Sequence, residues 1–230
     1  FNKIIDISDD KFHMSTILMM KGRVFQSQSK YDDAIDMYEK GIELAEKVDS
    51  SLLKARIDGY LGKIYLRKGK YDDALRMQMI YLNESQKAGD NREIGQAYMN
   101  LGGVYFHMSD YNLSISNWNQ ALEHFEKSNY TQGIAFINDN LGVANDILGR
   151  FDKALEHYQM SSEVMKKIGD VRGMSSVLLN IGALYNRMGD YQRALEYNMK
   201  SLQIKKKIGD TVGVANIYNN MGGNYLEMGR

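Results

Sequence analysis

The sequence of 230 residues contains no proline and no cysteine. Proline breaks helices because it lacks a backbone N–H and clashes with the preceding turn, so its absence permits long helices throughout the chain. The absence of cysteine excludes disulfide bonds and thiolate chemistry, and it leaves the redox state of the compartment open. We expect a soluble protein of undetermined location, with the cytoplasm favoured over the periplasm.

The sequence also lacks an excess of charge of either sign, with 29 Lys and Arg residues against 29 Asp and Glu residues. A general nucleic-acid binder carries a basic surface, so neutrality disfavours that role. No apolar run approaches the roughly 18 residues that a membrane-spanning helix needs, so we expect no direct membrane insertion. The chain starts with "FNKIIDISDD", without an initiator Met or a signal-peptide pattern. We therefore expect a piece of a longer protein.

What the sequence does contain is a period of forty residues. Glycine recurs at Gly22, Gly62, Gly102, Gly142, Gly182 and Gly222. An aromatic residue takes the same step at Tyr31, Tyr71, Tyr111, Phe151 and Tyr191, and a small residue at Ala34, Ala74, Ser114, Ala154 and Ala194. Such a fixed period indicates a stack of repeated supersecondary units.

Within one period the apolar residues are three or four positions apart, which is the spacing of one helix face. Gly189 is placed to end one helix in the left-handed conformation, and Asp190 to cap the next helix with its side chain. Gly209 and Asp210 repeat this pair at the following join. We predict two antiparallel helices per unit, with units beginning near residues 11, 51, 91, 131, 171 and 211. Residues 1–8 would be the end of a preceding helix.

The glycine in the middle of each first helix costs about 1 kcal/mol relative to alanine. Its recurrence predicts that paired helices approach closely there, with the small-residue series on the second helix as the counterpart. Trp118 shares a column with Tyr38 and Tyr158, so we expect it in the core. Met108, Met188 and Met228 share another column and are expected to be buried between units.

The segments "LGKIY", "LGGVY" and "IGALY", with "GKYDDA" and "GDYQRA", resemble the signature of the tetratricopeptide repeats. The family's usual proline is absent, and the period exceeds the commoner length of about 34 residues. The longer period is similar to that of kinesin light chain, of the G-protein-signalling modulators and of bacterial sensor and regulator proteins. The resemblance implies an all-α, right-handed solenoid of antiparallel helix pairs, with about five and a half repeats in a single domain over residues 1–230.

In this family the first helices line the concave side, so the resemblance places a binding site on their solvent-facing side. One column on that side reads Met20, Tyr60, Asn100, Asn140, Asn180 and Asn220. An asparagine amide both donates and accepts hydrogen bonds, so these residues suit the backbone of an extended peptide. In similar repeat proteins a ladder of this kind holds peptide main chain. Alternatively, the amides bond neighbouring helices or persist from duplication of one ancestral unit.

Charged residues adjoin this column. The basic ones lie toward the N-terminus and are Arg23, Arg56, Lys63, Arg67 and His107. Asp139 and Asp146 follow in the middle, with Arg187 and Glu227 toward the C-terminus. We predict that a bound protein segment is acidic where it meets the first two units. The alternative is an ordinary solvated face.

We therefore expect a non-catalytic protein-interaction module that binds an extended or helical peptide, as a scaffold or sensory part of a larger signalling protein. The histidines, His13, His107, His124 and His157, share no ligand spacing, and no phosphate-binding loop or nucleophile with a base is recognisable, so no metal or cofactor is expected. One alternative is the regulatory domain of a bacterial kinase, phosphatase or transcription regulator. Another is a single-stranded RNA reader, which neutrality disfavours. Self-association through a truncated end also stays open.

Overall fold

The computed structural model describes residues 2–229, with side chains from residue 10 onward. This part of the chain contains eleven α-helices and no strand. The helices are α1 (Asn2–Ser27), α2 (Tyr31–Glu46), α3 (Ser51–Arg67), α4 (Tyr71–Ala88), α5 (Asn91–His107), α6 (Tyr111–Lys127), α7 (Thr131–Ile147), α8 (Phe151–Ile168), α9 (Val171–Arg187), α10 (Tyr191–Lys207) and α11 (Thr211–Glu227). The predicted all-α solenoid of paired helices is confirmed.

Each helix ends where a residue adopts a left-handed conformation. Gly189 has φ 78°, and the next N–H, that of Asp190, donates back to the carbonyl of Tyr185 at 2.9 Å. Asp190 then caps α10 by accepting from the N–H of Arg193 at 3.0 Å. The predicted stop and start of the two helices at this join are therefore confirmed.

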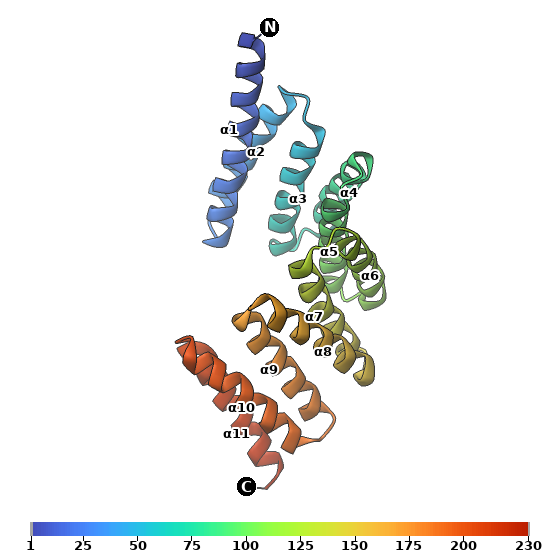
Figure 1. The fold of residues 1–230 in the computed structure, drawn as a ribbon, viewed down its shortest axis with the longest axis vertical. Helices are drawn as coiled ribbons and strands as arrows, with labels where there is room; N and C mark the ends of the chain where they lie inside the picture. Colours follow the sequence, from blue (N-terminus) through green and yellow to red (C-terminus); the bar gives the residue numbers. More distant parts are fainter. Residues whose placement is uncertain (1, 230) are drawn as a thin grey trace. The chain divides into compact units, whose positions relative to one another are not determined.

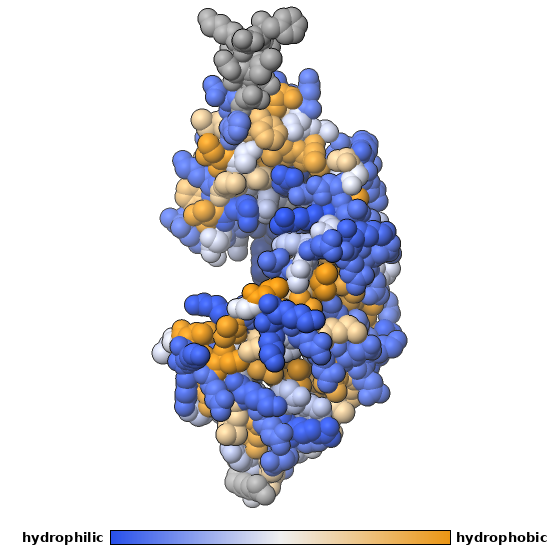
Figure 2. Space-filling model, viewed as in Figure 1, coloured by the Kyte–Doolittle hydropathy of each residue, from blue (hydrophilic) through white to orange (hydrophobic). Residues whose placement is uncertain are grey.

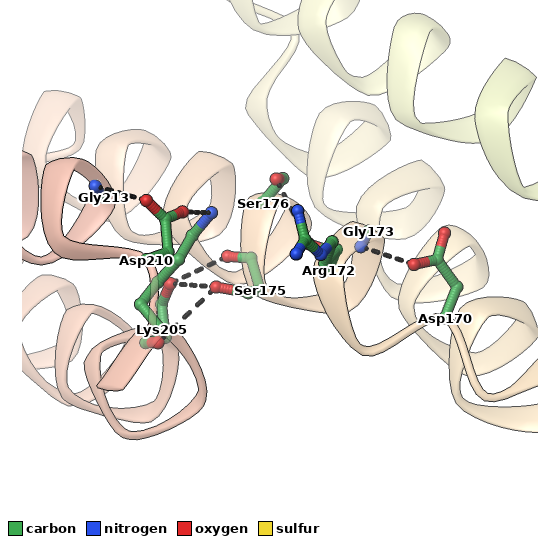
Figure 3. Close-up of polar contacts among 9 residues, drawn as sticks. Asp170, Arg172, Gly173, Ser175, Ser176, Lys205, Asp210 and Gly213 are labelled. Carbon is green, nitrogen blue, oxygen red and sulfur yellow. Dashed lines mark hydrogen bonds and ion pairs between the residues drawn. The ribbon is translucent and has the colours of Figure 1, made fainter. Parts of the chain in front are cut away.

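The joins before α9 and before α11 show the same capping chemistry (Figure 3). Asp170 accepts from the N–H of Gly173 at 2.8 Å, and Asp210 accepts from the N–H of Gly213 at 2.8 Å. Asp210 also contacts the ammonium of Lys205 at 2.8 Å, so one carboxylate links the end of α10 to the start of α11. These caps satisfy helix N–H groups that have no partner within the helix.

The chain divides into two compact units, residues 1–124 and residues 125–230. In the first unit α1 to α5 pack in chain order, each against the next, and in the second unit α7 to α11 do the same (Figure 1). The core of the first unit includes Tyr38, Ile57 and Ile64. The core of the second includes Tyr158 and Ile181.

Mid-helix glycines lie at close helix contacts as predicted, and large side chains join the small residues as their counterparts. A Cβ on Gly22 would lie 2.4 Å from the ring of Tyr38, and one on Gly102 would lie 2.4 Å from the ring of Trp118. The small-residue series takes part in these contacts, because the hydroxyl of Ser114 donates to the carbonyl of Gly102 at 2.8 Å. The carbonyls of Ala74 and Ala194 likewise would lie 3.3 Å from a Cβ on Gly62 and on Gly182. At Gly22, Gly102 and Gly142 an aromatic ring four positions after the small residue occupies the space that the missing glycine side chain leaves open.

Two further expectations differ from the structure. The helix α1 is continuous from Asn2 to Ser27, so no break separates a preceding helix from a unit starting near residue 11; Phe1 lies outside the described residues. Met108 and Met188 were expected between units but are 41% and 43% exposed, at the C-cap positions just after α5 and α9.

Hydrophilic residues cover most of the face shown in Figure 2, with apolar patches between them. Exposed apolar side chains include Ile17 and Val24 on α1, in columns that are buried in the following units at Ile57 and Ile64. None of the helices within residues 2–229 is both long and apolar enough to cross a membrane.

Candidate functional site

A cavity of about 520 Å³ opens beside α1, the start of α2 and α3. Its lining side chains are Arg23, Gln26, Ser27, Ser29, Tyr31, Tyr60, Lys63 and Arg67. Three of these are cationic and none is acidic. Four of the predicted site residues, Arg23, Tyr60, Lys63 and Arg67, are thus brought together by α1 and α3 at this cavity, which we call the basic cavity.

Tyr60 organises the basic cavity. The Cζ of Arg23 lies 5.1 Å from the centroid of the Tyr60 ring, and the Nζ of Lys63 lies 5.2 Å from it. Tyr38 stacks on Tyr60 with ring centroids 5.9 Å apart, and its hydroxyl donates to Gln26 at 2.8 Å. A cation over an aromatic face is stabilised by the ring quadrupole. Two like charges from different helices are therefore held beside one ring.

The cations of the basic cavity lack acidic partners. Burial, and then the nearby Arg23 guanidinium, lower the pKa of Lys63 to about 8. Within the part of the chain that the structure describes, Arg23, Lys63 and Arg67 make no ion pair with a carboxylate. An anion that enters the cavity would stabilise the protonated, charged form of Lys63, because a nearby opposite charge favours the protonated amine.

The other two predicted basic residues do not join this cavity. Arg56 is half-buried, and its Nε donates a hydrogen bond to Glu93 at 2.9 Å. Glu93 also accepts a hydrogen bond from the hydroxyl of Tyr81. Its charge is thus compensated inside the packing of α3 and α5. His107 is exposed at the end of α5, with its ring edge on to Phe106.

The asparagine column divides between two environments. Asn100 is buried and donates to the side-chain oxygen of Gln78 at 2.9 Å, while Gln78 donates to the carbonyl of Gly59 at 2.7 Å. Its amide therefore faces the seam between α4 and α5, as in the alternative that the sequence left open. The reason is that position 78 carries a glutamine where the first and fourth units carry tyrosine, so a polar partner is in reach.

In the second unit the column varies again. Asn180 donates to Asp139 on α7 at 2.9 Å, and Asn140 is half-buried. Asn220 is exposed on α11 and lines a separate pocket. A uniform row of free amides is therefore absent from the described residues of this unit, and the role of the column in binding stays a prediction.

The basic cavity is also lined by residues that were not among the predicted site residues, namely Gln26, Ser27, Ser29 and Tyr31. They lie at the end of α1, in the turn after it and at the start of α2, whereas the predicted site is confined to the solvent face of the first helices. Ser29 is the turn residue with positive φ, at 60°. Its closeness in sequence to Tyr31, which also lines the cavity, is the sequence signal that could have identified it.

Comparisons with known proteins agree with this architecture. The family profile described as tetratricopeptide repeat matches residues 13–79, 93–167 and 173–230. A comparison with curated proteins finds no significant match.

Several solved structures share the fold. Aspartyl phosphate phosphatase F from Bacillus subtilis aligns with a TM-score of 0.81 at 14% identity, over 96% of this chain and 60% of that one. A Rap protein complexed with competence and sporulation factor aligns with a TM-score of 0.70 at 13% identity, over 95% of this chain and 65% of that one. Kinesin light chain-like repeats from Podospora anserina align with a TM-score of 0.65 at 14% identity, over 76% of this chain and 86% of that one. At these identities the likeness shows the fold alone.

Proposed function

Because the chain belongs to the tetratricopeptide repeat family, we propose that it is a non-catalytic protein-interaction module that binds an acidic segment of a partner protein in the basic cavity. The observation that carries this proposal is the gathering of Arg23, Lys63 and Arg67 around one cavity without a carboxylate among its lining residues. The repeats themselves support a role in protein interaction.

The electrostatics of the cavity favour an anionic guest. Three cations close together repel one another, and burial also disfavours the charged form of Lys63. A carboxylate from a partner removes both costs, and Arg23 and Arg67 each offer several N–H donors to it. A Glu or Asp side chain of a peptide supplies this group, and the cavity of about 520 Å³ has room for more than one such side chain.

The similar structures are in keeping with a peptide guest. One of them is described as a Rap protein complexed with competence and sporulation factor. That description concerns the Rap protein, and it supports the proposal for this chain only through the shared fold.

A second candidate is a regulatory domain of a larger protein whose activity lies outside these residues. This chain spans 60% of aspartyl phosphate phosphatase F and 65% of the Rap protein. Both candidates can hold together, since a regulatory domain also acts by binding a protein segment.

The test is titration of a fluorescein-labelled hexaglutamate peptide, with hexaglutamine as the neutral probe. We expect the combined change Arg23→Ala, Lys63→Ala and Arg67→Ala to weaken hexaglutamate binding at least tenfold, or about 1.4 kcal/mol. The matched control is Lys40→Ala, Arg76→Ala and Lys87→Ala, which removes the same charge from exposed positions on α2 and α4. We expect less than a twofold change in the control. Equal losses in the two variants would show attraction by net charge alone and reject the basic cavity as the site.

Lys63 provides an independent readout. Its low pKa predicts that hexaglutamate affinity falls as the pH rises above about 8, because the amine then loses its proton. Lys63→Met should bind more weakly at pH 7 and lose this pH dependence. An unchanged pH profile in Lys63→Met would mean that Lys63 does not contact the guest.

A further inference from the structure

The second unit contains a pocket of about 300 Å³ bordered by α9, α10 and α11. Asparagine side chains dominate its lining, and these are Asn186, Asn198, Asn219, Asn220 and Asn224. Gly182, Ala183 and Gly223 also line it and leave the space open, because they carry little or no side chain. We call this the asparagine pocket.

The pocket arises from two departures from the forty-residue period. In three other units the position equivalent to Asn198 carries an aromatic residue, namely Tyr38, Trp118 or Tyr158. Those rings cover the mid-helix glycine, whereas the short side chain of Asn198 lies against Gly182 and fills less space.

Position 224 departs in the same direction. The column is apolar in the preceding units, where it reads Val24, Ile64, Val104, Ala144 and Leu184. Asn224 therefore places an amide where the other units have a core side chain. The two substitutions lie on different helices, yet both side chains line the same pocket.

Each of these asparagines has one polar atom without a partner. The Oδ1 of Asn198 and the Nδ2 of Asn224 make no hydrogen bond within the described chain, although the two residues are only 2% and 1% exposed. The other end of the Asn224 amide is satisfied, because its Oδ1 accepts from Asn186. A buried polar group without a hydrogen bond is costly, so such groups in native proteins need an explanation.

The first unit shows that a polar residue at this position does not have to lack partners. Gln78 occupies the position equivalent to Asn198, and its amide both donates to Gly59 and accepts from Asn100. Asn198 differs because its oxygen, which lies over Gly182, has no hydrogen-bond partner in the described chain.

We propose that the asparagine pocket binds an amide group, whose N–H donates to Asn198 Oδ1 and whose carbonyl accepts from Asn224 Nδ2. An amide carries both a donor and an acceptor, whereas a carboxylate offers only acceptors and an ammonium only donors. Arg187, which also lines the pocket, has its charge compensated by Asp146, so it does not select an anion. The proposal does not depend on the basic cavity, which belongs to the other unit.

The amide can come from the side chain of Gln or Asn or from a peptide backbone. Three small probes distinguish these sources: the N-acetyl, N-methylamide derivatives of glutamine, alanine and glutamate. Binding of all three indicates the backbone amide, and binding of the glutamine derivative alone indicates the side-chain carboxamide. The readout is the shift of the Asn224 side-chain NH₂ signal in NMR spectra of the full chain. In Asn224→Leu, which lacks this group, the side-chain NH₂ signal of Asn186, another lining residue, takes its place.

Two variants test the pocket separately. Asn198→Tyr restores the ring found at Tyr38 and Tyr158, and Asn224→Leu restores the residue found at Leu184. We expect each to weaken probe binding at least tenfold and to raise the melting temperature, because the space is filled or the unpaired group is removed. The matched control, Asn216→Leu, makes the same change at an exposed position on α11 and should leave probe binding unchanged.

Ordered water is the competing occupant, since a water molecule also satisfies one donor and one acceptor. In that case no probe shifts the Asn224 signal at its highest soluble concentration, and the proposal is overturned. Probe binding that survives Asn198→Tyr would overturn it as well, because the amide would then be bound elsewhere. If Asn224→Leu fails to fold, Asn198→Tyr still decides the outcome.

Discussion

The guanidinium of Arg187 on α9 donates to both carboxylate oxygens of Asp146 on α7, which lies 41 residues earlier. The Nε to Oδ1 distance is 2.8 Å. Asp146 is buried, with 4% of its surface exposed, whereas the side chain of Arg187 is about half exposed. The pair joins α7 and α9, the first helices of two successive repeats in the second unit. Both charges therefore stabilise helix packing, and neither is free to bind a ligand.

Arg187→Leu is expected to lower the free energy of unfolding by about 2 to 3 kcal/mol, because it leaves a buried carboxylate without a partner. Because the arginine is partly exposed and screened by solvent, this loss is at or below the low end of what breaking a fully buried ion pair costs. Chemical denaturation at pH 7 measures it. The control is Arg193→Leu, which removes the arginine of a more exposed pair with Asp190 and should cost much less than Arg187→Leu. Equal losses in the two variants would show that burial of Asp146 is unimportant.

Two adjacent glycines on α5 should respond to alanine with opposite signs. A Cβ on Gly102 would lie 2.4 Å from the Trp118 ring, while one on Gly103 meets no atom within 4 Å. Gly102→Ala should lose about 1 to 2 kcal/mol, because overpacking exceeds the gain in helix propensity. Gly103→Ala should gain up to about 1 kcal/mol. Thermal unfolding of both variants checks the pair, and stabilisation by Gly102→Ala would mean that the ring moves aside freely.

The period predicts the helices well because each boundary depends on local chemistry. A residue that tolerates positive φ ends a helix, and the following residues start the next one, so Ser51, Asn91 and Thr131 begin helices at the expected step. The basic cavity was also largely predictable, because Arg23, Lys63 and Arg67 lie on the same face of equivalent helices.

What could not be predicted is which neighbour each polar side chain meets. Helix periodicity gives the direction of Asn100, but its partner depends on Gln78, a departure from the aromatic column of another helix. Likewise, Arg187 and Asp146 were treated as separate charges on a groove, whereas they lie within hydrogen-bonding distance. Such pairs follow from the three-dimensional stacking of units, which the spacing within one helix does not contain.

Asn100 and Asn220 occupy the same column but should differ in their effect on stability. Asn100→Ala leaves the side-chain oxygen of buried Gln78 without its donor, so we expect a loss of about 1 to 3 kcal/mol. Asn220 is exposed, and its change to alanine should stay within about 0.5 kcal/mol. Denaturant titration of the two variants measures the difference. Identical midpoints would contradict the seam assignment of Asn100.

Asp58 on α3 should make stability depend on pH. Burial raises its pKa to about 6, against the lowering effect of Lys54 and with a further raising effect of Glu46. Between about pH 4 and 6 the folded chain retains a proton that the unfolded chain has released, so the Asp58 contribution favours folding at low pH and is lost as the pH rises through this window. Above it the buried carboxylate is charged and destabilises the fold.

Asp58→Asn should therefore stabilise the protein at pH 7 by about 2 to 3 kcal/mol and leave its stability near pH 3.5 almost unchanged, because the amide resembles the protonated acid in both charge and size. Denaturant unfolding of the variant and the parent chain at both pH values measures the effect. Asp10→Asn, at an exposed position on α1, serves as the control and should show no such dependence. If the stability difference between Asp58→Asn and the parent is the same at both pH values, the Asp58 carboxyl is either well solvated or paired with Lys54 strongly enough to offset its burial.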